Sequence, residues 1–258
     1  MNTFKKIGLT ALAGSLVATS AFAGELTATG SASMSVSNIT GTADTSTGKD
    51  FGMGNNVYLA GSGELDNGMT VSMSFELDSG VDTGTGTGPF DNHYVEVGSS
   101  ALGTLRLSGH GGSSAQSAMD TTAAGDIWNQ TMGVVGPTSA VAGNDSLYYT
   151  APEFMDSLVL TASMSPGRAS QESHTSFGLV YTGVEGLTFK YGHGDSGTPS
   201  AQASHTTIMA SYAVGSFTLS ASNTEDDNAD GTADRDVTSY QLAYTLTDDI
   251  SLTYGNEV

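Results

Sequence analysis

The chain contains no cysteine and few basic residues, and these absences narrow the functions that it can have. Without cysteine it can form neither disulfide bridges nor thiolate metal sites. The chain has seven Lys and Arg residues and 27 Asp and Glu residues, which gives a net charge of −20 over 258 residues. That balance speaks against a nucleic-acid binder, because neutralising phosphates requires basic side chains. After the N-terminal segment no apolar run approaches the ~20 residues of a transmembrane helix, which excludes a helical membrane protein.

The N-terminal segment Met1–Ala23 has the pattern of a secretory signal peptide. Two lysines precede a short apolar stretch, and Ala21-Phe22-Ala23 fits a small-x-small cleavage site. The apolar stretch is too short for a transmembrane anchor and is interrupted by polar and glycine residues. We therefore predict cleavage after Ala23 and a single domain over residues 24–258 that works outside the cytoplasm.

The dominant signal in the rest of the chain is an alternation of apolar and polar residues with a period of two. In Thr70–Asp78 the residues Val71, Met73, Phe75 and Leu77 share one face, and hydroxyl and acidic residues share the other. The same alternation recurs at Thr104–Ser108, Leu158–Met164, Phe177–Tyr181, Leu187–Tyr191, Ser216–Ser222, Tyr240–Tyr244 and Ile250–Tyr254. No segment sustains the apolar spacing of a core helix, so we predict an all-β chain.

Short and long connections alternate along these predicted strands. The short turns include Leu65–Gly68, where Asn67-Gly68 suits a tight turn with positive φ. The long connections are rich in Gly, Ser, Thr and Asp and are expected at Ile39–Asn55, Ser79–Asp91, His110–Asp145, Ser165–Glu172, His193–Ser204 and Thr224–Asp236. Short turns on one side and long loops on the other are typical of a transmembrane antiparallel up-and-down β-barrel. A soluble sandwich would show no such strict alternation.

The pattern contains about thirteen strands, whereas a bacterial barrel normally closes with an even number. A closed barrel of sixteen strands, at about 18 residues per strand, would need about 290 residues after the leader. We therefore expect the chain to lack about three strands at its C-terminal end.

Several segments resemble one family in order and spacing. Asn56–Gly68 is similar to its second strand and glycine turn, Tyr94–Gly98 and Leu102–Gly109 to its fourth and fifth strands, and Asn144–Phe154 to its sixth. The family is the Gram-negative general porins of the Rhodobacter type. The resemblance implies a homotrimer of sixteen-stranded, water-filled barrels in the lipid of the outer membrane, with the third loop folded inward. Members often carry a basic residue where this chain has Ala60 and Tyr148.

A porin acts as a sieve with an electrostatic preference, so its functional residues line the pore. The longest connection, His110–Asp145, occupies the position of the family's constriction loop, and its Asp120 and Asp126 are candidates for an acidic rim. The alternative is that both carboxylates are merely solvated.

Even-numbered and odd-numbered positions of a strand face opposite sides of the sheet, and this parity assigns further charged residues to the pore. Arg106 and Lys190 alternate with apolar neighbours, and a charge on the lipid face costs ~2–4 kcal/mol at the membrane midplane, so both should face inward. They are the two basic residues expected within strands. The acidic residues of the same inward parity are Glu64, Glu76, Asp78 and Glu96. We therefore predict an outer-membrane pore that prefers cations and passes small hydrophilic solutes.

The segment from Asp226 to Asp234 has the ligand spacing of a calcium loop. Asp226, Asn228, Asp230 and Asp234 occupy positions 1, 3, 5 and 9 around a glycine at position 6. The bidentate glutamate usual at position 12 is replaced by Val237. A weak external calcium site is one interpretation, and a solvated acidic loop tip is the other.

No motif predicts an enzyme. The serines form no G-x-S-x-G elbow, and no Ser, His and acidic residues cluster along the sequence. The histidines lack metal-ligand spacing. Apart from the possible calcium ion we expect no cofactor. The main alternative to a porin is a secreted or surface-exposed acidic β-protein of the adhesin or surface-layer type without a channel.

Overall fold

The computed structural model describes most of the chain after the predicted leader. The described residues are 26–39, 48–78, 91–119, 140, 144–153, 155, 157–167, 172–198, 201–228, 234–247 and 250–258. The predicted signal peptide and the boundary after Ala23 lie outside them. Over these ranges, no helix has the length and hydrophobicity needed to cross a membrane.

The described residues form thirteen β-strands and one short 3-10 helix, η1, at Ser117–Met119. The strands are β1 (Thr27–Ile39), β2 (Gly48–Glu64), β3 (Thr70–Asp78), β4 (His93–Ser99), β5 (Gly103–His110), β6 (Ser146–Thr150), β7 (Leu158–Ser165), β8 (His174–Tyr181), β9 (Leu187–Thr198), β10 (Ala201–Val214), β11 (Phe217–Asn228), β12 (Arg235–Thr247) and β13 (Ile250–Glu257). Their hydrogen-bonded order is their order along the chain. The predicted all-β, antiparallel up-and-down class is therefore confirmed.

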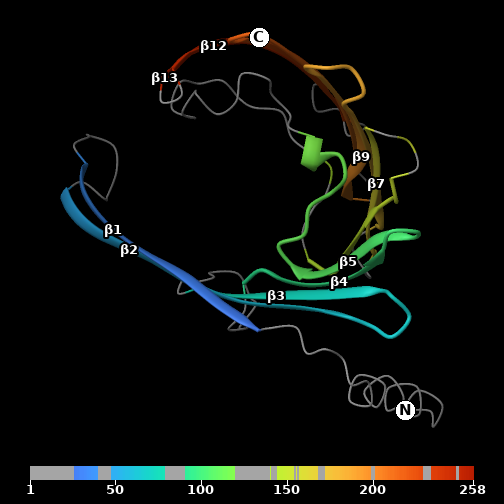
Figure 1. The fold of residues 1–258 in the computed structure, drawn as a ribbon. Coiled ribbons are helices and arrows are strands. Elements are labelled where there is room, and N and C mark those ends of the chain that lie inside the picture. Colours follow the sequence, from blue (N-terminus) through green and yellow to red (C-terminus); the bar gives the residue numbers. More distant parts are fainter. Residues whose placement is uncertain are drawn as a thin grey trace. The chain divides into compact units, whose positions relative to one another are not determined.

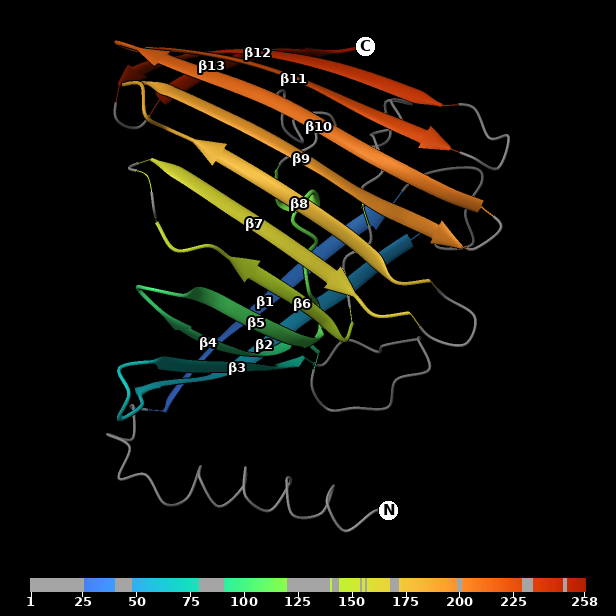
Figure 2. The same ribbon diagram turned by 90° about the vertical axis from the view of Figure 1, so that its right-hand side faces the viewer.

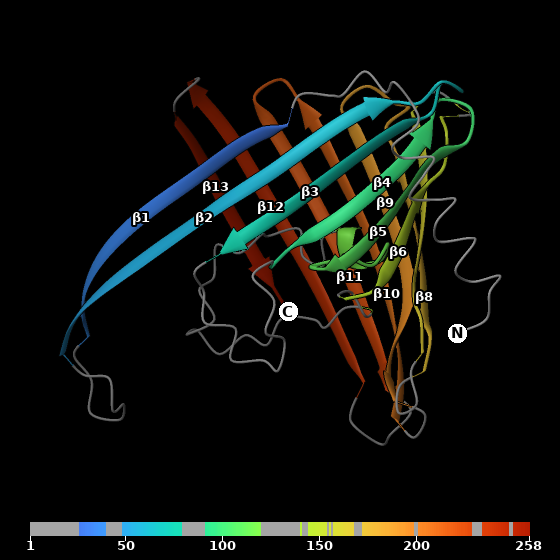
Figure 3. The same ribbon diagram turned by 90° about the horizontal axis from the view of Figure 1, so that it is seen from below.

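The chain divides into two compact units, which are described separately, one up to Val97 and one from Gly98. In the first unit β1 and β2 form a long antiparallel ribbon, visible in blue in Figure 3, and β3 continues it. The turn between β2 and β3 is the predicted one: Gly68 has φ of 77° and its N–H donates to the Leu65 carbonyl at 2.8 Å. The side chain of Asn67 accepts a hydrogen bond from the backbone of Met69, which closes the turn.

In the second unit the strands lie side by side in one tilted array (Figure 2), and their two faces differ in polarity. Strand β11 shows the difference most clearly. Phe217 and Leu219 are 48% and 53% exposed, whereas Thr224 and Asp226 on the other face are 0% and 1% exposed. A soluble protein buries apolar side chains and exposes polar ones. The reversed arrangement gives the exposed apolar face to lipid and the polar face to the interior.

Apolar residues of β3, β9 and β13 that face lipid under this assignment are not buried. Val71, Phe75 and Phe189 are partly exposed, and Leu252 is 61% exposed. The alternation therefore separates the faces in both units as the sequence predicts.

Several strands are longer than the sequence indicates. β2 begins at Gly48 within the predicted loop Ile39–Asn55, and β9 and β10 extend to Thr198 and from Ala201 within the predicted loop His193–Ser204. β11 and β12 extend in the same way into the predicted loop Thr224–Asp236. The prediction failed there because a strand that projects beyond the apolar band needs no apolar face, so its backbone pairing continues after the alternation ends.

An arginine at Leu219 should destabilise the folded protein in lipid vesicles, because Leu219 lies on the apolar face of β11. We expect Leu219→Arg to lower the free energy of unfolding by ~2–4 kcal/mol near the membrane midplane and by less toward the interface. The neighbouring Thr218→Arg, on the inner face, should change it by about 0.5 kcal/mol or less. Denaturant titration measures both, and equal losses would contradict the assignment of the faces.

Candidate functional site

A short segment after β5 turns onto the inner face of the second unit. It contains Ser114, Ala115, Gln116 and η1, and the first three residues are at most 1% exposed. Figure 1 shows η1 on the concave side of the strands from β5 to β13. The segment begins the connection that the sequence analysis assigned to the constriction loop.

Backbone donors of this segment bind hydroxyl groups of the strand wall. The Ala115 N–H donates to Ser163 Oγ at 2.9 Å and to Ser176 Oγ at 2.8 Å. Ser163 and Ser176 lie opposite each other on β7 and β8, and their oxygens are 2.6 Å apart. The polar inner face thus satisfies the backbone of a non-strand segment, as a buried segment requires.

Gln116 joins the wall to the returning part of the same connection. Its Nε2 donates to Thr207 Oγ1 at 2.9 Å, and its Oε1 accepts from the Ala140 N–H at 2.8 Å. Thr207 Oγ1 in turn lies 3.0 Å from Thr224 Oγ1 on the next strand. One side chain therefore links two parts of the long connection, at Gln116 and Ala140, to β10.

Glycines on β8 and β9 leave the room that the segment occupies. A Cβ at Gly192 would lie 2.8 Å from Met119 Cγ and 3.0 Å from the Gln116 Cα. A Cβ at Gly178 would lie 2.8 Å from the Ala115 carbonyl oxygen. The inward course of the third loop, which the resemblance implies, is therefore present in the described part of this connection. Asp120 and Asp126, the predicted acidic rim, lie outside the described residues.

The predicted basic residues lie on the polar face. Arg106 lies between Leu105 and Leu107, which are 40% and 50% exposed on the apolar face. Lys190 lies two residues before Gly192 on β9 and so shares its face, which is the face that the docked segment contacts.

The expectation that strands contain only these two basic residues is wrong. β2 includes Lys49 and β12 begins with Arg235, which is paired with Asp226 on β11. Both residues lie in the strand extensions that the alternation does not reveal.

In the first unit, Glu76 is buried at 5% exposure but fully hydrogen-bonded. Asn56 Nδ2 donates to its Oε1 at 3.1 Å and Asn92 Nδ2 donates to its Oε2 at 2.5 Å. Asp78 is paired with Asn56 in the β2–β3 ladder. Glu64 is exposed at the end of β2, and Glu96 is half-buried in β4. Glu76 is thus held by the wall, whereas Glu64 is open to solvent.

The predicted calcium ligands are divided between strand and connection. Asp226 and Asn228 belong to β11 and not to a loop. The Asn228 N–H donates to Asp234 Oδ1 at 2.9 Å, and Asp230 lies outside the described residues. The described residues contain no group of three or more His, Asp or Glu side chains that could hold a metal ion. The calcium site therefore stays a prediction.

Sequence analysis missed a hydrogen-bonded set of Ser196, His205 and Asp226 on the inner face of β9, β10 and β11. Ser196 Oγ lies 2.6 Å from His205 Nε2, and His205 Nδ1 lies 2.8 Å from Asp226 Oδ1. The strand parity could have revealed them. If the strands β9 to β11 are continued past the apolar alternation, Ser196, His205 and Asp226 all fall on the inner face.

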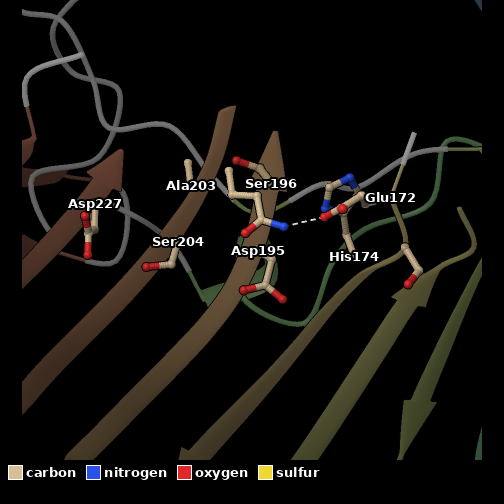
Figure 4. Close-up of a pocket in the computed structure, with 9 residues that line it drawn as sticks. Glu172, His174, Asp195, Ser196, Ala203, Ser204 and Asp227 are labelled. Carbon is tan, nitrogen blue, oxygen red and sulfur yellow. Dashed lines mark hydrogen bonds between the residues drawn. The ribbon is translucent and has the colours of Figure 1, made fainter. Parts of the chain in front are cut away.

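Ser196 lines a cavity of about 290 Å³ at the ends of β8 to β11 (Figure 4). Glu172, His174, Asp195 and Asp227 also line it. The side chain of Gln202 donates a hydrogen bond to Glu172, drawn as the dashed line in Figure 4.

These features define a class of protein. An antiparallel meander with an apolar outer face, a polar inner face and a loop docked on the inner face is an outer-membrane β-barrel channel. The family profile of the Gram-negative porins matches residues 8–257, and the chain belongs to that family. The predicted family and outer-membrane location are thereby confirmed, and this family and fold are those of channels.

Solved porin structures share the fold. An anion-selective porin from Comamonas acidovorans is 16% identical, with 90% of this chain and 78% of that chain covered and a TM-score of 0.55. OmpF of Salmonella typhi, in complex with daunomycin, is 11% identical, with 91% and 79% covered and a TM-score of 0.57. A loop-deletion mutant of OmpT from Vibrio cholerae is 12% identical, with 91% and 81% covered and a TM-score of 0.60. No curated protein matches the chain in a sequence comparison.

Adding one methyl group at Gly192 should disturb the docked segment. We expect Gly192→Ala to lower the free energy of unfolding by about 1–3 kcal/mol, because its Cβ would overlap Met119 and the Gln116 backbone. Gly61→Ala is the matched control, because a Cβ there meets only ordinary contacts at 3.6 and 3.7 Å.

Single-channel recording of the same variants tests whether the loop is held by this contact. Gly192→Ala should increase the open-channel current noise, and Gly61→Ala should not. Unchanged stability and noise in Gly192→Ala would show that the segment does not lie against β9.

Proposed function

We propose that the chain forms a passive channel for small hydrophilic solutes and ions, with a preference for cations. The observation that carries the proposal is the docked segment on a polar wall: buried Ser, Thr and Gln side chains face inward and fix a loop across that face. A loop held in a polar lumen narrows a pore without closing it to water. Membership of the porin family favours this function over the surface-layer alternative.

The charge inventory supports the cation preference. The chain carries 27 acidic against seven basic residues, and Glu64, Glu76 and Glu96 share the polar parity of their strands. Arg106, Lys190 and Arg235 are the basic residues on the inner face of the described second unit. The anion selectivity of the Comamonas porin belongs to that protein, since 16% identity carries the fold alone.

The surroundings of the channel follow from the same reasoning. The exposed apolar face of β10 to β13, with Tyr240 at 54% and Leu252 at 61% exposure, suits contact with outer-membrane lipid. We also propose a homotrimer, which the family resemblance implies.

Reversal potentials across a lipid bilayer with a potassium chloride gradient test the preference. We expect potassium to permeate more readily than chloride, most clearly near 0.01 M salt, where the Debye length is about 30 Å. The double variant Glu64→Gln, Glu96→Gln should shift the reversal potential toward zero. Glu225→Gln is the matched control, because Glu225 is an exposed residue on the outward parity of β11. A chloride preference in the unmodified protein would overturn the cation preference.

A further inference from the structure

Three inward-facing side chains on consecutive strands form a continuous hydrogen-bonded chain. His205 on β10 is directly opposite Gly194 on β9 and Asp226 on β11. The imidazole reaches Ser196, which lies two residues farther along β9 from Gly194. Diagonal neighbours of this kind lie within reach of a long side chain. The result is the pair of contacts at 2.6 Å and 2.8 Å from the two ring nitrogens.

The contact with Asp226 selects one tautomer of the neutral imidazole. A carboxylate only accepts hydrogen bonds, so Nδ1 of His205 carries the proton that Asp226 Oδ1 receives. In the neutral imidazole Nε2 is then an acceptor, and the Ser196 hydroxyl donates to it. An imidazole oriented by a carboxylate at Nδ1 and bonded to a serine hydroxyl at Nε2 is the arrangement that activates serine nucleophiles.

The burial of the three residues suits the same role. His205 and Asp226 are each 1% exposed, so water cannot displace their contact and the ring is held in one orientation. Ser196 is only half-buried and borders the 290 Å³ cavity shown in Figure 4. The base and its carboxylate are therefore enclosed, while the nucleophile is accessible.

The lining of the cavity restricts what can bind beside Ser196. Three carboxylates, from Glu172, Asp195 and Asp227, line it, and they disfavour an anionic ligand. Its volume admits only a small molecule or one end of a larger one. The side-chain amide of Gln202 and the ring of His174 supply hydrogen-bond donors in the same cavity.

We propose that Ser196, His205 and Asp226 form a nucleophilic site that hydrolyses small neutral or cationic carboxylic esters. Ser196 Oγ attacks the ester carbonyl carbon while its proton passes to His205 Nε2. The carbon–oxygen bond to the alcohol then breaks, and the alcohol leaves with that proton. A water molecule attacks the acyl-serine through the same base, which releases the carboxylic acid and returns the proton to Ser196. Asp226 is the positioning residue.

An uncharged fluorophosphonate probe tests the nucleophile on the full chain in detergent. We expect the probe to modify Ser196, identified by peptide mass spectrometry, and Ser196→Ala to lose this modification. His205→Asn should slow it by about 100-fold or more, because the general base is removed. His193→Asn is the matched control: His193 is also hydrogen-bonded, to Thr206 at 2.9 Å, but lies on the outward parity of β9. Ser211→Ala is the control for a hydrogen-bonded serine without a histidine.

Two further measurements separate an active site from a structural hydrogen-bond chain. Asp226→Asn should slow the modification, and Asp226→Glu should restore part of the rate. Neutral 4-nitrophenyl acetate should be hydrolysed faster than the anionic 4-nitrophenyl hemisuccinate. Ion conductance of every variant shows whether the channel has folded. A conducting protein whose Ser196 is not modified, or is modified equally in His205→Asn, would overturn the site and leave the channel function intact.

Discussion

The pairing of backbone polar groups within the membrane is the constraint from which the rest of this structure follows. In hydrocarbon no water can satisfy an N–H or a carbonyl, so each strand must bond to its neighbours. Extended strands place successive side chains on opposite faces, and one face meets lipid while the other meets water. The alternation of β11, with Phe217 and Leu219 exposed and Thr224 and Asp226 buried, is the direct consequence. The Ser and Thr residues on the inner face of β11 follow from the same requirement, because that face must be polar.

The polar inner wall then serves as the core on which the long connection is fixed. In a soluble protein, apolar contacts would hold such a segment, whereas here Ser163, Ser176 and Thr207 do so through hydrogen bonds. Gly178 and Gly192 allow the segment to approach the strand backbone. The hydroxyl groups thus have two roles: they make the wall hydrophilic, and they give the loop backbone the partners that it needs when water is excluded.

Much of this fold could be predicted from the sequence because the alternation and the turn residues are local signals. Asn67-Gly68 defines its turn through the positive φ of glycine, and the neighbours of Arg106 define its face. The docking of Gln116 could not be predicted, since its partners Thr207 and Ala140 are 91 and 24 residues away along the chain. The ends of β9 to β11 could not be predicted either, because beyond the lipid band a strand loses the apolar residues that mark its period. Ser196 and Asp226 fall in predicted loops for this reason.

The same feature that hid these residues makes their arrangement well defined. A loop of Gly, Ser and Asp would hold a serine and a histidine only transiently, whereas paired strands fix their backbone positions and restrict their side chains to one face. The register of β9, β10 and β11 brings His205 opposite Asp226 and within reach of Ser196, so one ladder provides the carboxylate and the other the hydroxyl group. The polar strand ends of a channel can therefore carry a rigid site without altering the apolar band, because residues beyond the lipid are free of the constraint that fixes the rest of each strand.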